Sequence, residues 1–388
     1  MLVTGFKLAA MLVLLCSCVI KEKKAPGTKL DIAGMDTDGG YGVFDPAVAQ
    51  DPLTSRLWLT YSAIDPAGAD QWLGKFNRAV SSRLAFSEDG INWQDTASIS
   101  PATAETLDVS GSSQRAIWGS ETSSIVYDRS APEKERWKVI WHRFLTVEGL
   151  PRFDFGWLSI KVSATAEGLS TASEEKFISS YLYSDINDSR NSRSRPPVGG
   201  APVLTAGSML NELSTSICVE PALFATDSAL YLAMACNDIE HKFWRIPLFR
   251  CQSPCNYRSP NSWSHVANLL TTDVGRSMGF KAFSAPSLFE KDGRKFIIAT
   301  PVVEKDGNDS HYSGCHVFEF SDIDAGTLIQ DQSGNPQVIK TIGGLSGSFH
   351  GACGYHAGME GSGILYSQLW VEHALGFFSI YKSHQNVP

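Results

Sequence analysis

The clearest hydrophobic pattern in the chain is a pair of short apolar runs, Ala222–Ala225 and Ala229–Ala235, separated by the polar residues Thr226–Ser228. Apolar runs of this length, bounded by turn residues, predict two β-strands joined as a hairpin. An acidic residue, Glu220, followed by a proline, precedes the first run. The stretch Val219–Cys236 therefore predicts a hairpin whose first strand begins at a carboxylate.

The same pattern of apolar strand, polar turn and apolar strand occurs four more times, beginning at Asp45, Glu121, Ser284 and His350. The five copies start roughly 65 to 100 residues apart, which is longer than the common short repeats but compatible with propeller blades that carry long loops. No change of composition marks a second domain. The chain is therefore expected to form one all-β domain built by radial repetition.

Each copy is followed by a second strand pair. The clearest is Arg83–Trp93, in which a strand, the turn residues Ser87–Gly90 and a tryptophan follow one another. Looser versions occupy Ile160–Leu169, Pro247–Trp263, Val317–Leu328 and Phe377–Lys382. Two hairpins per copy predict a five-bladed β-propeller with four-stranded antiparallel blades, in which the first strand of every blade lines a central funnel.

The N-terminus carries a targeting signal. Lys7 precedes the apolar run Leu8–Leu15, which is too short to span a bilayer and fits the core of a signal peptide. The run ends in Leu-Cys-Ser-Cys, which resembles a bacterial lipobox. Cys18 is the predicted lipidation site and Cys16 the second candidate, and an ordinary signal peptide cut nearby is the alternative.

These signals give the expected organisation of the chain. Residues 1–18 are a lipoprotein signal peptide, residues 19–40 a flexible tether, and residues 41–388 the propeller domain. We expect a monomer in the cell envelope, attached to the membrane only through its lipid. The absence of an acidic residue after Cys18 favours the outer membrane, facing the periplasm or the cell surface.

Composition narrows the classes of ligand. The formal net charge is −8 and no basic patch is visible, which disfavours nucleic-acid binding. Neither a Gly-x-Ser-x-Gly elbow nor a phosphate-binding glycine loop is present. The 11% aromatic content, with 10 tryptophans, suits recognition of sugar faces, although filling a β core explains most of these rings. Candidates for a sugar-stacking wall are Trp58, Trp72, Trp118 and Phe280.

Six cysteines follow the predicted anchor, and in an exported protein an even number suggests disulfides. Cys218 and Cys236 flank the central hairpin, Cys251 and Cys255 are close enough to close a small loop, and Cys315 and Cys353 remain as a third pair. The connectivity stays open at this point. A zinc site built from Cys251, Cys255 and a histidine is the alternative for that pair.

The acidic residues give the funnel its interest. If the copies superpose, Asp45, Glu121 and Glu220 all lie at or just before the start of an innermost strand, on one rim. Like charges raise one another's pKa, and this coupling can hold one carboxylic acid protonated near neutral pH while another stays ionised. Glycoside hydrolysis needs that division of roles. The alternative is that these residues only enter strands or cap turns.

Three motifs resemble those of the five-bladed propeller glycosidases, the group of glycoside hydrolase families 43, 32 and 68. Phe44-Asp45-Pro46 resembles the first-blade segment that carries the general base. Trp118-Gly119-Ser120-Glu121 has the spacing of the second-blade segment, with Glu in place of the Asp that tunes the acid. Val219-Glu220-Pro221 resembles the third-blade segment that carries the general acid. The glutamate and Phe44, which replaces a frequent polar residue, leave catalytic competence open.

The resemblance implies inverting hydrolysis of a polysaccharide or oligosaccharide, with arabinose- or xylose-containing chains as the family default. Asp45 would deprotonate a water molecule, Glu220 would protonate the leaving oxygen, and Glu121 would raise the pKa of Glu220 and hold it in place. The base and the acid would then lie roughly 6.5–9.5 Å apart.

His350 opens the fifth copy and resembles the family 43 histidine near the funnel centre. The resemblance implies a structural Ca²⁺ or other cation beside it, whereas the reaction itself requires no cofactor. A hydrogen-bonded histidine at a strand start is the alternative. Two functions from different classes therefore stand: an envelope-anchored glycosidase acting on a carbohydrate substrate, and a non-catalytic propeller that binds glycan or a protein partner through the same funnel.

Overall fold

The computed structural model describes residues 27–35, 42–65, 79–109, 112–147, 150–179, 203–238, 241–305, 309–343, 350–359, 361–370 and 377–387. The predicted signal peptide and Cys18 lie outside these residues, as does Trp72. None of the helices in the described part of the chain is long and apolar enough to cross a membrane.

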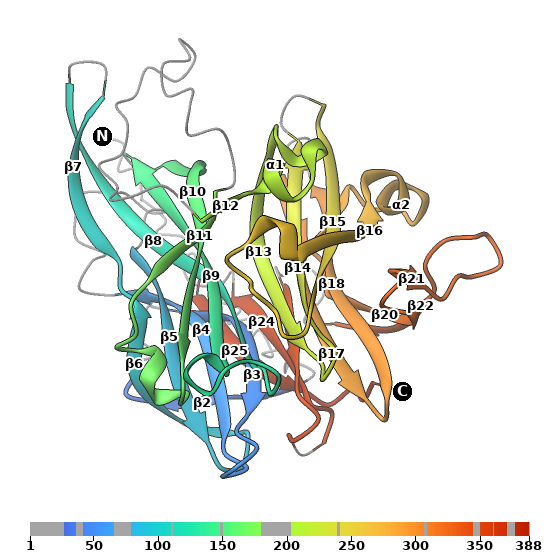
Figure 1. Cartoon of the computed structure of the whole chain (residues 1–388), viewed down its shortest axis with the longest axis horizontal. Helices are drawn as coiled ribbons and strands as arrows, with labels where there is room; N and C mark the ends of the chain where they lie inside the picture. The colour runs from blue at the N-terminus through green and yellow to red at the C-terminus, as the bar shows by residue number, and fades with distance from the viewer. Residues whose placement is uncertain are drawn as a thin grey trace, which may run out of the picture.

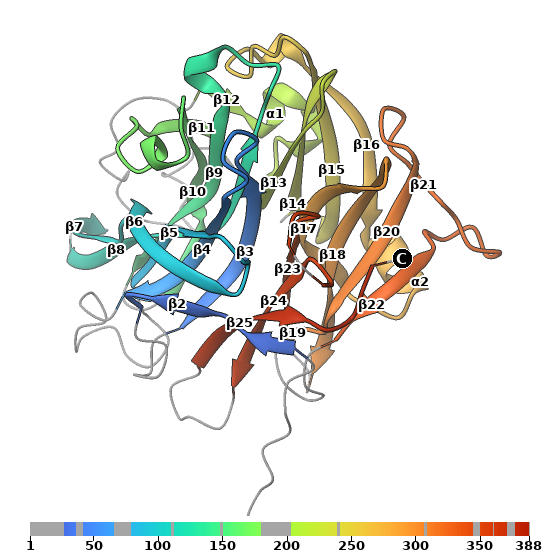
Figure 2. The same ribbon diagram turned by 90° about the horizontal axis from the view of Figure 1, so that it is seen from below.

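Five antiparallel sheets follow one another around a central axis and form the five-bladed propeller expected from the sequence (Figures 1 and 2). From the axis outward, blade 1 contains β3 (Val43–Gln50), β4 (Leu57–Asp65), β5 (Ala79–Ser87) and β6 (Asn92–Ser100). Blade 2 contains β8 (Ser112–Tyr127), β9 (Trp137–Val147), β10 (Leu150–Ser163) and β11 (Glu175–Ser179), with β12 (Leu204–Thr205) at its edge. Strand β7 (Thr103–Val109) pairs with the first half of β8.

Blade 3 contains β13 (Ser216–Ala225), β14 (Ala229–Asp238), β15 (Phe243–Gln252) and β16 (Trp263–Thr271). Blade 4 contains β17 (Ala282–Lys291), β18 (Arg294–Lys305), β20 (Cys315–Asp322) and β22 (Val338–Ile342), with the short strands β19 (Asp309–Tyr312) and β21 (Thr327–Leu328) attached. Blade 5 contains β23 (His350–Tyr355), β24 (Ile364–Trp370) and β25 (Phe377–Ser383). The helical segments are short: α1 (Ala206–Met209), α2 (Thr272–Ser277), η1 (Glu133–Glu135), η2 (Glu167–Leu169), η4 (Asn211–Leu213) and η5 (Pro260–Ser262).

The fourth strand of blade 5 comes from the other end of the chain. Strand β1 (Gly27–Lys29) pairs antiparallel with β25 and closes the ring (Figure 2). Strand β2 (Asp31–Ala33) pairs parallel with β6 of blade 1, and Leu30 and Ile32 are buried between the two blades. The structure therefore corrects the expected tether, because residues 27–33 belong to the propeller. These two strands are only three residues long and follow a Lys-rich segment, so their alternating pattern is too short to predict strands from the sequence.

Each of the five interfaces between neighbouring blades is filled by its own cluster of buried side chains. Because a middle strand is covered by a neighbouring blade on both faces, it reads as a continuous apolar run rather than an alternating one. Strand β14 shows this, since all of its residues except Asn237 are buried. This is why the hairpin around β14 is the clearest pattern in the sequence.

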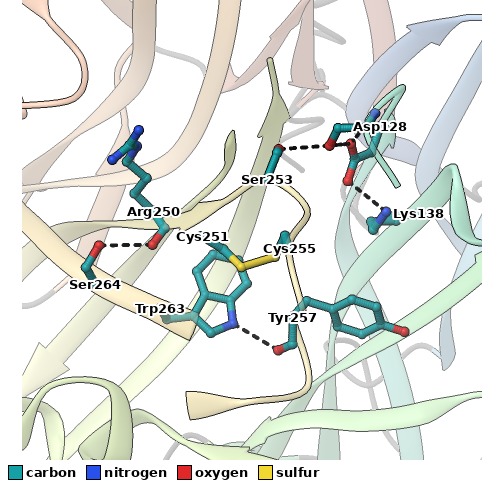
Figure 3. Close-up of a disulfide and its surroundings, with 10 residues drawn as sticks. Asp128, Lys138, Arg250, Cys251, Ser253, Cys255, Tyr257, Trp263 and Ser264 are labelled. Carbon is teal, nitrogen blue, oxygen red and sulfur yellow. Dashed lines mark hydrogen bonds and ion pairs between the residues drawn. A yellow bond between two sulfur atoms is a disulfide. The ribbon is translucent and has the colours of Figure 1, made fainter. Parts of the chain in front are cut away.

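Three disulfides join the cysteines in the pairs suggested by the sequence. Cys218–Cys236 links the paired strands β13 and β14, and Cys315–Cys353 joins blade 4 to blade 5. Cys251–Cys255 closes the loop after β15, next to the buried Trp263 (Figure 3). Because both of its sulfur atoms are used in this bond, the alternative zinc site is excluded at Cys251 and Cys255.

The loop closed by this disulfide is tied to blade 2. Ser253 exchanges a hydrogen bond of 2.8 Å with Ser130, whose hydroxyl donates to Asp128 at 2.6 Å. Asp128 also accepts from Lys138 at 2.9 Å, and both side chains of that pair are buried (Figure 3). A disulfide-closed loop and a buried ion pair therefore join blades 2 and 3 at the end of the strands away from the carboxylates.

The innermost strands share one backbone feature, a β-bulge close to the funnel rim. In each blade a residue other than glycine at this bulge has a positive φ, between 44° and 55°, in the order Asp45, Thr122, Glu220, Ala285 and Ala352. Such a conformation is uncommon for L-residues and needs support from its surroundings.

Hydrogen bonds between blades supply that support. The backbone N–H of Thr122 donates to Ser62 Oγ at 2.9 Å, that of Ala352 to Thr300 Oγ1 at 2.9 Å, and that of Asp45 to Ser367 Oγ at 2.9 Å. Each acceptor belongs to the second strand of the preceding blade. Within that blade it pairs with the residue that comes just before the blade's own bulge. The last of these bonds joins blade 5 to blade 1.

We predict that Thr300→Val lowers the free energy of unfolding by about 1–3 kcal/mol, because it leaves the buried Ala352 N–H without an acceptor. Thr341→Val in the same blade is the control, since Thr341 is exposed and such surface changes are usually within about 0.5 kcal/mol. Denaturant unfolding of the three proteins measures the difference. Equal stability of the two variants would contradict a role for the inter-blade bond.

Candidate active site

The bulges bring the three predicted carboxylates together at one end of the funnel. Asp45 and Glu220 occupy equivalent bulge positions in β3 and β13, whereas Glu121 lies one residue before the bulge of β8, where Thr122 takes the equivalent place. All three side chains are half-buried. Glu121 and Glu220 both raise the pKa of Asp45, and Glu220 raises that of Glu121, so the three groups lie within electrostatic reach of one another.

Glu220 is held by blade 4 rather than by its own blade. Its Oε2 accepts the backbone N–H of Ala285 at 2.7 Å and the hydroxyl of Ser284, and its Oε1 accepts the hydroxyl of Tyr312 at 2.6 Å. The second-strand position that carries a hydroxyl in blades 1, 4 and 5 is Ala235 in blade 3. The Glu220 carboxylate therefore replaces the missing hydroxyl as the acceptor for the next blade.

This arrangement fixes the orientation of Glu220, because three donors from blade 4 hold its two carboxylate oxygens. The pKa of the Tyr312 phenol is raised well above its ordinary value by burial and by the nearby Glu220 charge, so this hydroxyl stays a donor.

Glu121 has the opposite surroundings. Among the described residues, none donates a hydrogen bond to its carboxylate, and burial followed by the Glu220 charge raises its pKa to about 8. His142 lies opposite on β9, with Nδ1 3.9 Å from Glu121 Oε1. Burial lowers the pKa of His142 to about 3, so the ring carries no charge in its contact with Glu121 at neutral pH. Glu121 is therefore a protonated acid at neutral pH, and its side chain is 21% exposed.

Asp45 has hydrogen-bond donors, as Glu220 has, and is also buried next to negative charges, as Glu121 is. Its Oδ2 accepts from Ser62 Oγ at 2.9 Å and from Thr122 Oγ1 at 3.4 Å. Burial, Glu121 and Glu220 nevertheless raise its pKa well above 3.8. The hydroxyl of Ser62 also accepts the N–H of Thr122, so one side chain links the bulge of blade 2 to the carboxylate of blade 1.

The funnel closes directly below the carboxylates. The residues that follow the bulges, among them Pro46, Pro221 and Pro286, line a cavity of only 30 Å³, which is room for about one water molecule. A larger cavity of 940 Å³ lies on the opposite face, between the β13–β14 and β17–β18 turns, away from the carboxylates. The larger cavity is therefore separated from the three carboxylates by the length of the strands.

The aromatic candidates divide into core and surface. Trp58 is 1% exposed between blades 1 and 2, and Trp118 is 6% exposed, with its indole N–H donated to Glu105 and its ring 4.9 Å from Trp157. The structure therefore corrects the expected stacking role of both rings, which belong to the core. Phe280 is half-buried and lines a cavity on the carboxylate face. Phe44 packs on Phe378 at 4.9 Å, which explains an apolar residue before Asp45.

His350 begins β23 two residues before the bulge of blade 5 and is buried against the Ser313–Gly314 turn of blade 4. Among the described residues, no three His, Cys, Asp or Glu side chains converge in a manner suited to a metal ion. The cation expected near His350 therefore stays a prediction, and we derive no step through one.

Two residues that support the carboxylates, Ser62 and Tyr312, were not predicted from the sequence. Ser62 lies inside an apolar strand, and Tyr312 belongs to β19, an insertion between strands of blade 4. Ser284 stands out in the sequence only as the residue of the fourth copy at the position where the first three copies carry an acid. The equivalence of bulge positions is the signal that would have pointed to Ser62, whereas nothing in the sequence indicates Tyr312.

Comparison with solved structures gives similarity in fold. A Bombyx mori family 32 β-fructofuranosidase matches at 12% identity with a TM-score of 0.48, covering 92% of this chain and 61% of that enzyme. A family 117 glycoside hydrolase of the marine bacterium Zobellia galactanivorans matches at 13% identity and a TM-score of 0.47, covering 92% and 90%. The native Bacillus subtilis arabinanase matches at 12% identity and a TM-score of 0.44, covering 92% and 95%.

This chain thus spans less than two thirds of the silkworm enzyme, which is the first of these matches. No family model and no curated protein sequence matches the chain. At these identities the likeness concerns the fold alone. The chain has the five-bladed propeller fold that is also found in these glycosidases.

Proposed function

We propose that the protein is a glycoside hydrolase that acts by inversion on a polysaccharide or oligosaccharide. The observation that carries this proposal is the convergence of three carboxylates from consecutive blades with opposite hydrogen bonding. Groups whose surroundings push their pKa values apart are suited to acid and base roles. Arabinose- and xylose-containing chains are the first substrates to test, because of the motif resemblance around Asp45 and Glu220.

The hydrogen bonds favour a different assignment of roles from the one that the resemblance implies. Glu121, protonated at neutral pH, gives its proton to the glycosidic oxygen as the bond to the anomeric carbon breaks. Asp45 takes a proton from the water molecule that attacks the anomeric carbon from the opposite face. Burial and the charge of Glu220, whose carboxylate is held by Ala285 and Tyr312, keep the pKa of Glu121 high. Tyr312, Ser284 and Ser62 position these carboxylates.

We predict a bell-shaped dependence of kcat/KM on pH for the free enzyme. Activity rises as Asp45 ionises, above the ordinary range of an aspartate, and falls as Glu121 loses its proton near pH 8. Glu121→Gln lowers kcat/KM on a glycan by about 10²–10⁴-fold but much less on an activated aryl glycoside, whose leaving group needs no proton. Glu220→Gln moves the basic limb to lower pH, because the charge that raises the pKa of Glu121 is lost.

Steady-state kinetics of the three proteins on both substrate types measure these effects. Selective loss of glycan activity in Glu220→Gln, with Glu121→Gln equally impaired on both substrates, would return the acid role to Glu220. If no glycan of a broad panel is hydrolysed while one is bound, the second function, a non-catalytic glycan-binding propeller, takes its place.

The location in the cell envelope belongs to the same proposal and depends on residues 1–18. Exchange of Cys18 for alanine is expected to move the protein from the membrane fraction to the soluble fraction of expressing cells, because a lipid attached to that thiol is its anchor. Fractionation and incorporation of labelled palmitate measure this. Membrane association that persists in both Cys18→Ala and a Cys16→Ala control would contradict lipid anchoring at Cys18.

A further inference from the structure

A second cavity opens on the carboxylate face, between blades 3 and 4. It has a volume of 870 Å³, which is within the usual range for a ligand site. Its walls come from the end of β14, the start of β15, helix α2 and the segment Gly279–Lys281 that leads into β17. Helix α2 and the neighbouring ends of β15 and β16 are seen at the upper right of Figure 1. The cavity is separate from the 30 Å³ space below the carboxylates.

The cavity is cationic in an acidic protein. Lys242, Arg276 and Lys281 line it, and none of the described residues that line it is acidic. The formal net charge of the whole chain is −8, so basic side chains grouped around one cavity are a local exception. Lys281 has an interaction partner of its own, so the charge available to a ligand comes from Lys242 and Arg276. Asp273 lies beside Arg276, with its Oδ1 3.9 Å from Arg276 Nη1. Both of these side chains are largely exposed, and such a pair contributes little.

Aromatic and amide groups complete the lining. Trp244 and Phe280 are half-buried, and Asn237 adds a side-chain amide. The backbone of Trp244 is held by Thr272, whose hydroxyl accepts the backbone N–H of Trp244 at 2.6 Å. Phe280 is fixed by a backbone bond of 2.8 Å to Gly275 and by edge contacts of its ring with Phe283 and His316. The aromatic walls are therefore held in place before a ligand arrives.

The cavity is connected to the carboxylates through one strand. Lys281 precedes Ser284 and Ala285, the donors that hold Glu220, by only three or four residues. This separation corresponds to about 10–13 Å along an extended strand. The cavity is therefore about two to three sugar units away from the donors that hold Glu220, within the length of a short oligosaccharide.

From these observations we propose that the cavity is a subsite for an anionic sugar unit of the substrate, carrying a carboxylate or a sulfate ester. Arg276 offers paired N–H donors of the kind that recognise planar or tetrahedral anions. Lys242 adds charge, and Trp244 and Phe280 provide faces for the sugar ring. This inference deepens the proposed function, because it names the class of glycan on which that site would act.

Binding to three probes tests the subsite: a glucuronic-acid-substituted xylo-oligosaccharide, its carboxyl-reduced neutral counterpart, and a sulfated galacto-oligosaccharide. We expect at least one anionic probe to bind more tightly than the neutral one at low ionic strength. Arg276→Glu lowers the affinity for that probe by about tenfold or more, the effect of losing one charge-assisted hydrogen bond. It leaves the affinity for the neutral probe unchanged. The probe that is preferred identifies carboxylate or sulfate as the ligand group.

Arg129→Glu is the matched control, because Arg129 is exposed on the opposite face and its exchange changes the net charge equally. Equal affinity for all three probes, or equal losses in Arg276→Glu and Arg129→Glu, would overturn the subsite. Calorimetry is done on the full chain with intact catalytic carboxylates and repeated with Glu121→Gln to exclude turnover. Charge-selective binding without hydrolysis supports the subsite and contradicts the glycosidase. Hydrolysis of neutral glycans without charge selectivity does the reverse.

Discussion

The hydrogen bond from the bulge residues Asp45, Thr122, Ala285 and Ala352 to the preceding blade is the constraint on which the rest of the structure depends. A propeller is closed only if blade 5 is fixed to blade 1, and here this is done by the Asp45 N–H on Ser367 together with strand β1 beside β25. The same bond holds a backbone with positive φ in place at every blade where a hydroxyl is present. The funnel rim is therefore rigid at the height of the carboxylates.

One departure from this repeat creates the site chemistry. Blade 3 has Ala235 where a hydroxyl is expected, and the Glu220 carboxylate crosses to blade 4 and accepts the Ala285 N–H instead. A carboxylate so used is fixed in place, and its charge adds to burial in raising the pKa of Glu121. Glu220 therefore links two blades and also separates the protonation states of the neighbouring acids. Structural and catalytic explanations of this residue are compatible.

The fold was largely predictable because blades bury their middle strands on both faces, which leaves long apolar runs such as β14 in the sequence. The three acids were found because each stands at the start of such a run. The roles of the three acids could not be predicted, because they depend on which neighbouring residue donates a hydrogen bond to which carboxylate oxygen. Tyr312 comes from an inserted strand, and Glu121 is displaced by one residue from the bulge position. Burial likewise decided Trp58 and Trp118, since a tryptophan in a strand looks the same whether it faces core or solvent.

The central claim is that burial and the charge of Glu220 raise the pKa of Glu121 to about 8. Carboxyl ¹³C NMR of protein labelled at the glutamate side chains measures this directly, with Glu121→Gln and Glu220→Gln used for assignment. The account predicts one glutamate that titrates near pH 8, disappears in Glu121→Gln and moves to lower pH in Glu220→Gln. A Glu121 resonance that titrates in the ordinary range near 4.5, or one that is unchanged by Glu220→Gln, would contradict it.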